Sequence, residues 1–182
     1  NAIFMHAGLF GRIDALYQDR GRLALDAEQL RMLERIHLDF VRAGARLTGQ
    51  QRLRYGAVMS ELASLTTQFS QNVLAEEAAF ALQLRDDKDL AGLPGFVRDA
   101  ARAAAEQRGL GPGAFVITLS PSLAEPFLTF SDRRDLRETV WRARKSRGAN
   151  GGAHDNRAVA AKIMALRQEQ AALHGYASYA EY

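Results

Sequence analysis

The sequence predicts a mainly α-helical fold, a scaffold of several helices that carries a small two-stranded β element. Apolar residues recur every three or four positions over most of the 182 residues, which is the spacing of one helix face. One of these patterns is unusually long and needs a neighbouring helix to cover it. Two short segments in the middle of the chain instead alternate or are rich in β-branched residues, which indicates strands.

The N-terminal half shows three amphipathic patterns. A first helix is expected after Phe10, and a second runs from Asp26, its N-cap, to Gly44, its C-cap. A third extends from about Gln50 towards Glu77. Its apolar positions are Tyr55, Val58, Met59, Leu62, Leu65, Phe69 and Val73. We expect the second and third helices to form an antiparallel hairpin joined by "RLTGQ".

The middle of the chain predicts strand, helix and strand. "AFALQLRDD" alternates and ends in the acidic turn "DDKD", so it indicates a strand. "GLPGFVRDAARAAAEQRG" is an Ala-rich helix that begins at a proline and is closed by Gly109. "GPGAFVITLS" is a turn followed by a second strand. Residues 78–120 could therefore form a small α/β insertion in what is otherwise a single helical segment, 1–182.

The C-terminal part predicts two more helices. "SPSLAEPFLTF" contains two prolines, so we expect it to be extended or irregular. Ser131 is placed to cap a helix that runs to about Arg147, and Asp155 to cap the last helix, which ends near Leu173.

Composition excludes several classes of function. The 24 basic and 21 acidic residues are mostly interleaved and give a net charge of +3, which is no nucleic-acid footprint. There is no cysteine, so disulfide and thiolate chemistry are excluded. No apolar run approaches the roughly 20 residues of a membrane span, and no signal peptide is visible. We therefore expect a cytoplasmic location, with no membrane and no nucleic acid as partner.

The four histidines do not predict a metal site. His154 and His174 bracket the last helix, so they cannot share an ion, and we expect them to mark its ends. His37 lies on the apolar side of its helix, which favours a buried, hydrogen-bonded histidine over a ligand. His6 has no ligand partner at useful spacing. The zinc-hydrolase motif H-E-x-x-H is absent, so we expect no catalytic and no metal-binding residue in this chain.

Acidic and glycine-rich segments also favour structural interpretations. The pairs Glu76-Glu77 and Asp86-Asp87 are adjacent in sequence, so their side chains diverge and make no general acid/base dyad by spacing alone. With Asp89, the second pair indicates a solvated turn, because the alternation of a calcium loop is missing. "RGLGPGAF" follows a helix and precedes a strand, the reverse of the order in phosphate-binding loops.

The helix predicted after Ser131 has basic flanks. Its apolar stripe is formed by Leu136, Val140 and Ala143, and the flanking arginines are Arg133, Arg137 and Arg144. Pairing with carboxylates of a neighbouring helix is the favoured interpretation. The alternative is a non-catalytic helical interaction module in which these arginines hold an anionic partner, such as a substrate carboxylate or a nucleic-acid phosphate.

Four segments resemble the thimet oligopeptidase family of zinc metallopeptidases. They are "LTTQFSQNVLAEEAAF", "DLAGLP", "FVITLSPSLAEPFLTFSDRRDLRETVWRARKSRGANGGAHDN" and "LRQEQAALHGYASYAEY". The resemblance extends from Phe10 to Tyr182 and is nearest to the bacterial peptidyl-dipeptidase branch. The chain starts at Asn1, not Met, and a new helical pattern begins just before Tyr182, so we expect a piece of a longer protein.

The resemblance implies a large, two-lobed, mostly helical enzyme that hydrolyses short peptides in a deep channel, with release of C-terminal dipeptides favoured. It implies a zinc ion held by H-E-x-x-H and a later glutamate, motifs that lie downstream in the family and match no position here. The resemblance therefore places no catalytic or metal-binding residue in this chain, and it leaves any substrate-binding residues unidentified. It implies a scaffold that forms part of the channel wall, is inactive alone, binds no zinc and exposes apolar surface through which it self-associates.

Overall fold

The computed structural model of the chain describes residues 3–4 and 6–182. These residues pack as two compact units. The first unit combines Asn1–Ser64 with Lys162–Tyr182, and the second is Leu65–Ala161. Each unit is considered by itself below.

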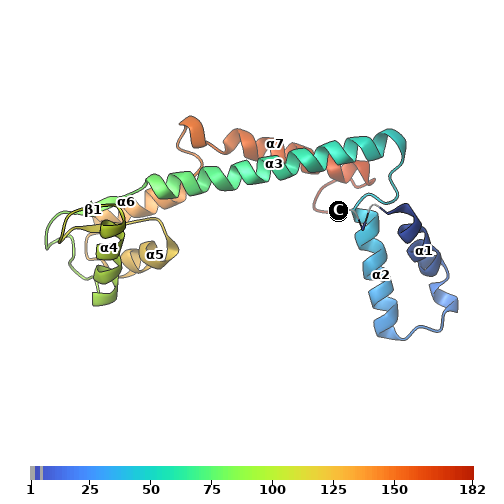
Figure 1. The fold of residues 1–182 in the computed structure, drawn as a ribbon, viewed down its shortest axis with the longest axis horizontal. Coiled ribbons are helices and arrows are strands. Elements are labelled where there is room, and N and C mark those ends of the chain that lie inside the picture. The colour runs from blue at the N-terminus through green and yellow to red at the C-terminus, as the bar shows by residue number, and fades with distance from the viewer. Residues whose placement is uncertain (1–2, 5) are drawn as a thin grey trace. The chain divides into compact units, whose positions relative to one another are not determined.

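The predicted fold class is confirmed, because the described residues are mainly helical and carry one small sheet (Figure 1). The α-helices are α1 (Ala7–Gln18), α2 (Ala27–Arg42), α3 (Gly49–Ala79), α4 (Gly95–Gln107), α5 (Pro121–Phe130), α6 (Arg134–Lys145) and α7 (Arg157–Leu173). Two short 3-10 helices are η1 (Arg20–Arg22) and η2 (Gly152–His154). Strands β1 (Leu82–Leu84) and β2 (Phe115–Ile117) pair antiparallel, with Gln83 opposite Val116. No helix in the described part of the chain is long and apolar enough to cross a membrane.

In the first unit, α1 packs along α2, as the two blue helices of Figure 1 show. The aromatic ring of Tyr17 stacks on His37 with 3.8 Å between ring centroids, and Phe10 stacks on Phe40 at 6.1 Å. The predicted hairpin of α2 with α3 is therefore wrong. α2 finds its antiparallel partner in α1, because the aromatic side chains of α1 cover its apolar stripe.

The ends of α2 follow their sequence signals. Asp26 accepts a hydrogen bond from the Gln29 amide at 2.8 Å, and the Gln29 side chain accepts one from the Asp26 amide, which completes a capping box. At the other end Gly44 adopts φ +90°, and the Ala45 amide reaches back to the Phe40 carbonyl. This is the Schellman arrangement, in which a left-handed glycine lets the chain leave the helix.

Two ion pairs and a shared carbonyl hold the rest of the first unit together. Arg54 of α3 donates to Glu169 of α7 at 2.7 Å, and Lys162 pairs with Glu61. The hydroxyl groups of Tyr55 and Tyr182 both donate to the carbonyl oxygen of Arg42, at 3.0 Å and 2.7 Å. Burial raises the pKa of Tyr55 to about 12, so this hydroxyl stays protonated as a donor.

The core of the second unit lies between the sheet and helices α4, α5 and α6. Its fully buried side chains include Val97, Val116, Ile117, Leu119, Phe127 and Val140. β2 packs against α4, and α5 packs against both α4 and α6. Gly109 closes α4 as predicted, with φ +68° and a hydrogen bond from the Leu110 amide to the Ala105 carbonyl.

The segment expected to be extended, "SPSLAEPFLTF", is instead the helix α5. Pro121 occupies its first position, where a missing N–H costs nothing. Pro126 lies inside the helix and removes one backbone hydrogen bond, a cost of about 3 kcal/mol. Burial of Leu123 and Phe127 in the core offsets it, since each buried side chain of this size contributes about 1.5–3 kcal/mol.

The predicted cap of the next helix is also corrected. α6 begins at Arg134, and its N-cap residue Arg133 makes no side-chain cap. Ser131 is the C-cap residue of α5 and is buried, and its hydroxyl accepts from the Arg133 amide at 3.2 Å. The serine therefore shapes the α5–α6 connection and does not start the helix.

Candidate functional site

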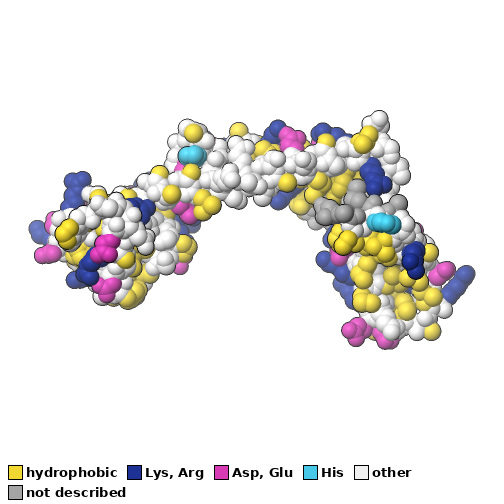
Figure 2. Space-filling model, viewed as in Figure 1, with side chains coloured by type: hydrophobic (Ala, Val, Ile, Leu, Met, Phe, Trp, Pro, Cys, Tyr) yellow, Lys and Arg dark blue, Asp and Glu magenta, His cyan; other side chains and the backbone are white. Residues whose placement is uncertain are grey.

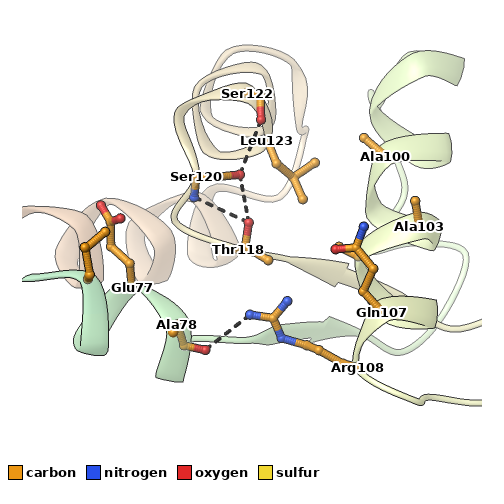
Figure 3. Close-up of a pocket in the computed structure, with 12 residues that line it drawn as sticks. Glu77, Ala78, Ala100, Ala103, Gln107, Arg108, Thr118, Ser120, Ser122 and Leu123 are labelled. Carbon is orange, nitrogen blue, oxygen red and sulfur yellow. Dashed lines mark hydrogen bonds between the residues drawn. The ribbon is translucent and has the colours of Figure 1, made fainter. Parts of the chain in front are cut away.

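A hollow of the second unit lies beside α4 and has a volume of about 510 Å³ (Figure 3). We call it the α4 hollow. Its lining residues come from the end of α3, from one face of α4 and from the β2–α5 connection: Leu74, Glu77, Ala78, Ala100, Ala103, Ala104, Gln107, Arg108, Thr118, Ser120, Ser122 and Leu123. Alanines on α4 leave the space open, while polar side chains line two of its sides.

Three hydroxyl groups form a row along one side of the α4 hollow. Thr118 Oγ1 lies 2.9 Å from Ser120 Oγ, which lies 3.4 Å from Ser122 Oγ. The Ser120 amide also donates to Thr118 Oγ1 at 3.4 Å. Hydroxyl groups both donate and accept, so the row can hold a polar ligand. No histidine lines the hollow, so these serines have no imidazole base there to activate them as nucleophiles.

The charged groups of the α4 hollow are engaged in holding the fold. Arg108 donates to the carbonyl oxygens of Ala78 and Phe80, at 3.3 Å and 3.4 Å, and so satisfies the C-terminal end of α3. Glu77 forms an ion pair with Arg147. The hollow therefore offers polar contacts without a catalytic acid or base.

A polar network connects α3 to the loop before α7. Glu76 accepts hydrogen bonds from the Gly148 amide and the Asn150 side chain, at 2.7 Å and 2.9 Å. Buried Asn156 accepts from Asn72 and donates to the Phe69 carbonyl, both at 2.9 Å. Glu76 and Glu77 thus position this loop, as acceptors for a turn and not as a catalytic pair.

Asp155 stabilises the start of α7, but α7 begins at Arg157, so Asp155 lies one residue before the N-cap position that the sequence predicted for it. Its carboxylate accepts from the Arg157 amide at 2.9 Å and from the Gly151 amide at 2.9 Å. The Arg157 guanidinium lies against the same carboxylate, and together these donors hold the pKa of Asp155 well below its usual range.

The histidines occupy structural positions. His37 is buried and its Nε2 donates to Asp14 at 2.7 Å, which confirms the predicted hydrogen-bonded core histidine. His174 and Gly175 end α7, and His174 Nδ1 donates to the Gln170 carbonyl at 2.9 Å. His6 accepts from the Leu9 amide at the start of α1, and His154 lies in η2.

Among residues 3–4 and 6–182, no three His, Asp or Glu side chains converge on a point that could hold a metal ion. The donor set of a zinc site, as the resemblance implies it, is therefore not present in this part of the chain. The described residues do not fit the metal, and no catalytic step is assigned to them.

The sequence predicted that the acidic turn after β1 is solvated, but the turn is only partly exposed to solvent. Asp89 is only 7% exposed, accepts from the Arg85 amide at 2.8 Å and pairs with Arg133. Asp86 accepts from the Lys88 amide at 2.9 Å and the Asp89 amide at 3.1 Å. The prediction was wrong for Asp89, because its partner on α6 lies 44 residues away in sequence.

The three arginines predicted to flank α6 all have partners within the chain. Arg133 also binds Asp135 at 2.7 Å, and this contact lowers the pKa of Asp135 to about 2. Arg144 pairs with Glu125 of α5 at 2.6 Å, and Arg137 donates to the Ser131 carbonyl. The predicted pairing with a carboxylate of a neighbouring helix is confirmed for Arg144, whereas Arg133 pairs with carboxylates of a turn and of its own helix, and Arg137 binds backbone instead. The interaction-module alternative, in which all three arginines together hold an anionic partner, is unsupported, because Arg133 and Arg144 are already paired with carboxylates of the chain.

Two features of this region were missed in the sequence. The Asn72–Asn156 pair joins residues 84 positions apart, and nothing near either asparagine predicts it. The hydroxyl row of the α4 hollow had a visible signal, since Thr118, Ser120 and Ser122 alternate in "ITLSPSL".

Comparison with known proteins gives a consistent set of relatives. No protein-family model matches the chain. The chain is 37% identical over 180 residues to the dipeptidyl carboxypeptidase of Salmonella typhimurium, 33% identical over 180 residues to the oligopeptidase A of Haemophilus influenzae and 32% identical over 179 residues to that of Escherichia coli. These matches cover 99%, 97% and 96% of this chain, but the chain spans only 26% of the length of each relative.

Proposed function

The chain is homologous, over almost all of its own length, to part of the enzymes of the thimet oligopeptidase family, and we propose that it serves as a helical scaffold within a longer peptidase. In that enzyme it forms part of the wall of a channel that admits short peptides. The observation that carries the proposal is the 37% identity to a dipeptidyl carboxypeptidase over 99% of the chain.

The polar contacts of the described residues support a scaffold role. The carboxylates that could have served in catalysis are used to position structure: Glu76 and Glu77 hold the loop before α7, and Asp89 holds β1 to α6. In the proposed enzyme, peptide bonds are hydrolysed by water activated on a zinc ion whose ligands lie outside this chain. The chain alone is then inactive and binds no catalytic zinc.

Release of C-terminal dipeptides is the proposed reaction, because the relatives named dipeptidyl carboxypeptidase are 37% and 34% identical and those named oligopeptidase A from bacteria are 32–33% identical. We propose the cytoplasm as the site of action, in line with a plant relative named as a probable cytosolic oligopeptidase A.

Exposed apolar side chains support the proposal that more polypeptide covers this chain. On the face drawn in Figure 2, apolar side chains lie exposed between mixed acidic and basic ones. The most exposed include Leu53, Leu74, Phe96, Met32 and Met164, each at least 59% exposed. The isolated chain should therefore self-associate and bind a hydrophobic dye.

The test compares the 182-residue chain with the full-length product of its gene. The full-length product should release dipeptides from the C-terminus of a short peptide, and a chelator should abolish this activity while added zinc restores it. Cleavage at internal bonds would overturn dipeptide release and keep the peptidase assignment. Hydrolysis by the 182-residue chain alone, or no hydrolysis by the full-length product, would contradict the scaffold proposal.

A further inference from the structure

The outer face of α6 carries a second hollow, with a volume of about 450 Å³. Arg134, Arg137, Glu138 and Trp141 recur at positions i, i+3, i+4 and i+7, so they share one side of the helix, and Leu128 of α5 completes the lining. We call this the Trp141 face. The buried stripe that contains Val140 points the other way, so the Trp141 face contributes little to the core of its unit.

Positive charge on the Trp141 face is not neutralised within the described residues. Arg134 is exposed and binds no carboxylate there, and Arg137 donates to a backbone carbonyl, that of Ser131. The one carboxylate in the lining, Glu138, is paired with Arg142 at 2.6 Å. Two guanidinium groups three residues apart on a helix repel each other, and a carboxylate between them would remove that repulsion.

The apolar part of the Trp141 face is also uncovered. Trp141 is 50% exposed although tryptophan is among the largest apolar side chains, and Leu128 is only partly buried beside it. Tryptophan and arginine are both enriched among the few residues that dominate the binding energy of protein interfaces. Arginine in particular matches the geometry of a carboxylate with two parallel hydrogen bonds.

We propose that the Trp141 face binds an acidic peptide, with carboxylates against Arg134 and Arg137 and an apolar side chain against Trp141 and Leu128. The occupant is a separate peptide, selected by charge complementarity with the two unneutralised arginines. This binding needs no hydrolysis, so it can be tested independently of the proposed peptidase function.

Trp141 gives the proposal a direct measurement, because it is the only tryptophan of the 182-residue chain. Tryptophan fluorescence is titrated with a short Asp/Glu-rich peptide that carries one leucine and no tryptophan, and with a Lys-rich peptide of equal length. The acidic peptide should change the fluorescence and saturate. Its affinity should fall as salt is raised from about 0.05 M to about 0.5 M, since exposed charges are screened.

Two substitutions separate the Trp141 face from general electrostatics. Arg134→Gln should weaken the acidic peptide about 2- to 5-fold, the range expected for an exposed ion pair. Arg12→Gln removes another exposed arginine, in α1, and should leave the affinity unchanged. Both positions are on the surface, so both variants should keep the helical circular dichroism of the parent chain.

The same peptides, labelled with fluorescein, are tested by anisotropy against the full-length product and its Arg134→Gln variant. A preference for the acidic peptide that Arg134→Gln reduces would support the proposal in the intact protein. Equal binding of acidic and basic peptides, or equal loss with Arg12→Gln and Arg134→Gln, would overturn it. Failure of the full-length product to bind would also overturn it, and would indicate that the rest of the polypeptide covers this face.

Discussion

Gly92 should be the glycine of the second unit that tolerates substitution least. It adopts φ +78°, a backbone conformation that side chains disfavour. A Cβ built at this position would lie 2.3 Å from the carbonyl oxygen of Phe130 and 2.9 Å from the amide nitrogen of Asp132. Both are backbone atoms at the α5–α6 connection, so neither can rotate away. The Gly92→Ala substitution must therefore move one backbone segment against the other.

The magnitude follows from these two terms. An L-residue in the left-handed region costs about 1–2 kcal/mol, and forcing extra atoms into a packed contact costs about 1–3 kcal/mol. A central value of about 3 kcal/mol corresponds to a fall in Tm of about 12–24 °C for a unit of roughly 100 residues.

Two other glycines of the same unit serve as matched controls. Gly113 has φ +84° but nothing within 4 Å of its Cβ position, so Gly113→Ala should show the backbone cost alone, about 1–2 kcal/mol. Gly95 begins α4 with open space around it and no positive φ, so Gly95→Ala should stabilise the unit by about 0.4–1 kcal/mol.

Urea and thermal unfolding are followed by the fluorescence of Trp141, which lies in the second unit and so reports on it. The expected order of stability is Gly95→Ala, parent, Gly113→Ala and Gly92→Ala. If Gly92→Ala were no less stable than Gly113→Ala, the close approach to Phe130 and Asp132 would not be a constraint and the reasoning would be refuted.

Three further predictions concern single residues. Ala24 has φ +46°, so Ala24→Gly should raise the free energy of unfolding of the first unit by about 1 kcal/mol, measured by circular dichroism in urea; a loss of stability would contradict this. The hydrogen bond from His37, with Arg46 close by, lowers the pKa of Asp14, so the folded state favours the ionised carboxylate. The ionised carboxylate stabilises the fold above the pKa that Asp14 has in the unfolded chain, about 3.9, and this stabilisation is lost as the pH falls below that value. Asp14→Asn should therefore make the urea midpoint less sensitive to acid, and an unchanged pH profile of the midpoint would refute this prediction. Asn156→Ala should cost about 2–3 kcal/mol through two lost hydrogen bonds, and its effect should be less than additive with Asn72→Ala.

Local sequence signals predicted the helix ends well. The capping box at Asp26 and the glycines Gly44, Gly109 and Gly175 act through backbone groups only a few residues away. The residues that determine each of these helix ends are therefore close together in the sequence. The small sheet followed in the same way from two short apolar segments, although its strands are shorter than the alternating patterns that predicted them.

The failures came from partners distant in the sequence. Nothing near α2 indicates that α1 covers it, because that choice depends on how the aromatic rings of Tyr17 and His37 fit together. The prolines of α5 argued against a helix, and only its packing against the core of the second unit reverses the local preference. The sequence around Asp89 indicated a solvated side chain, because its partner Arg133 is distant in the sequence.

The candidate sites were the least predictable part. The row of hydroxyl groups had a signal in the sequence pattern. The hollow that this row lines also depends on the small alanine side chains of α4, which line another side of it. For α6 the helical spacing predicted the basic flank, whereas the pairing of each arginine depended on where Glu125, Asp89 and Ser131 lie in space.

The loop before α7 has a consequence for engineering the protein. Its two ends are tied to each other, because the backbone amide of Asn156 donates to the Gly148 carbonyl at 2.7 Å. The Glu76 carboxylate accepts a hydrogen bond from the backbone amide of Gly148. Ala153, between these ties, is exposed. Lengthening a loop whose ends are already fixed costs little entropy. A label or a short foreign peptide inserted at Ala153 would interrupt the short helix η2, but it should be carried on the surface without disturbing α6 or α7.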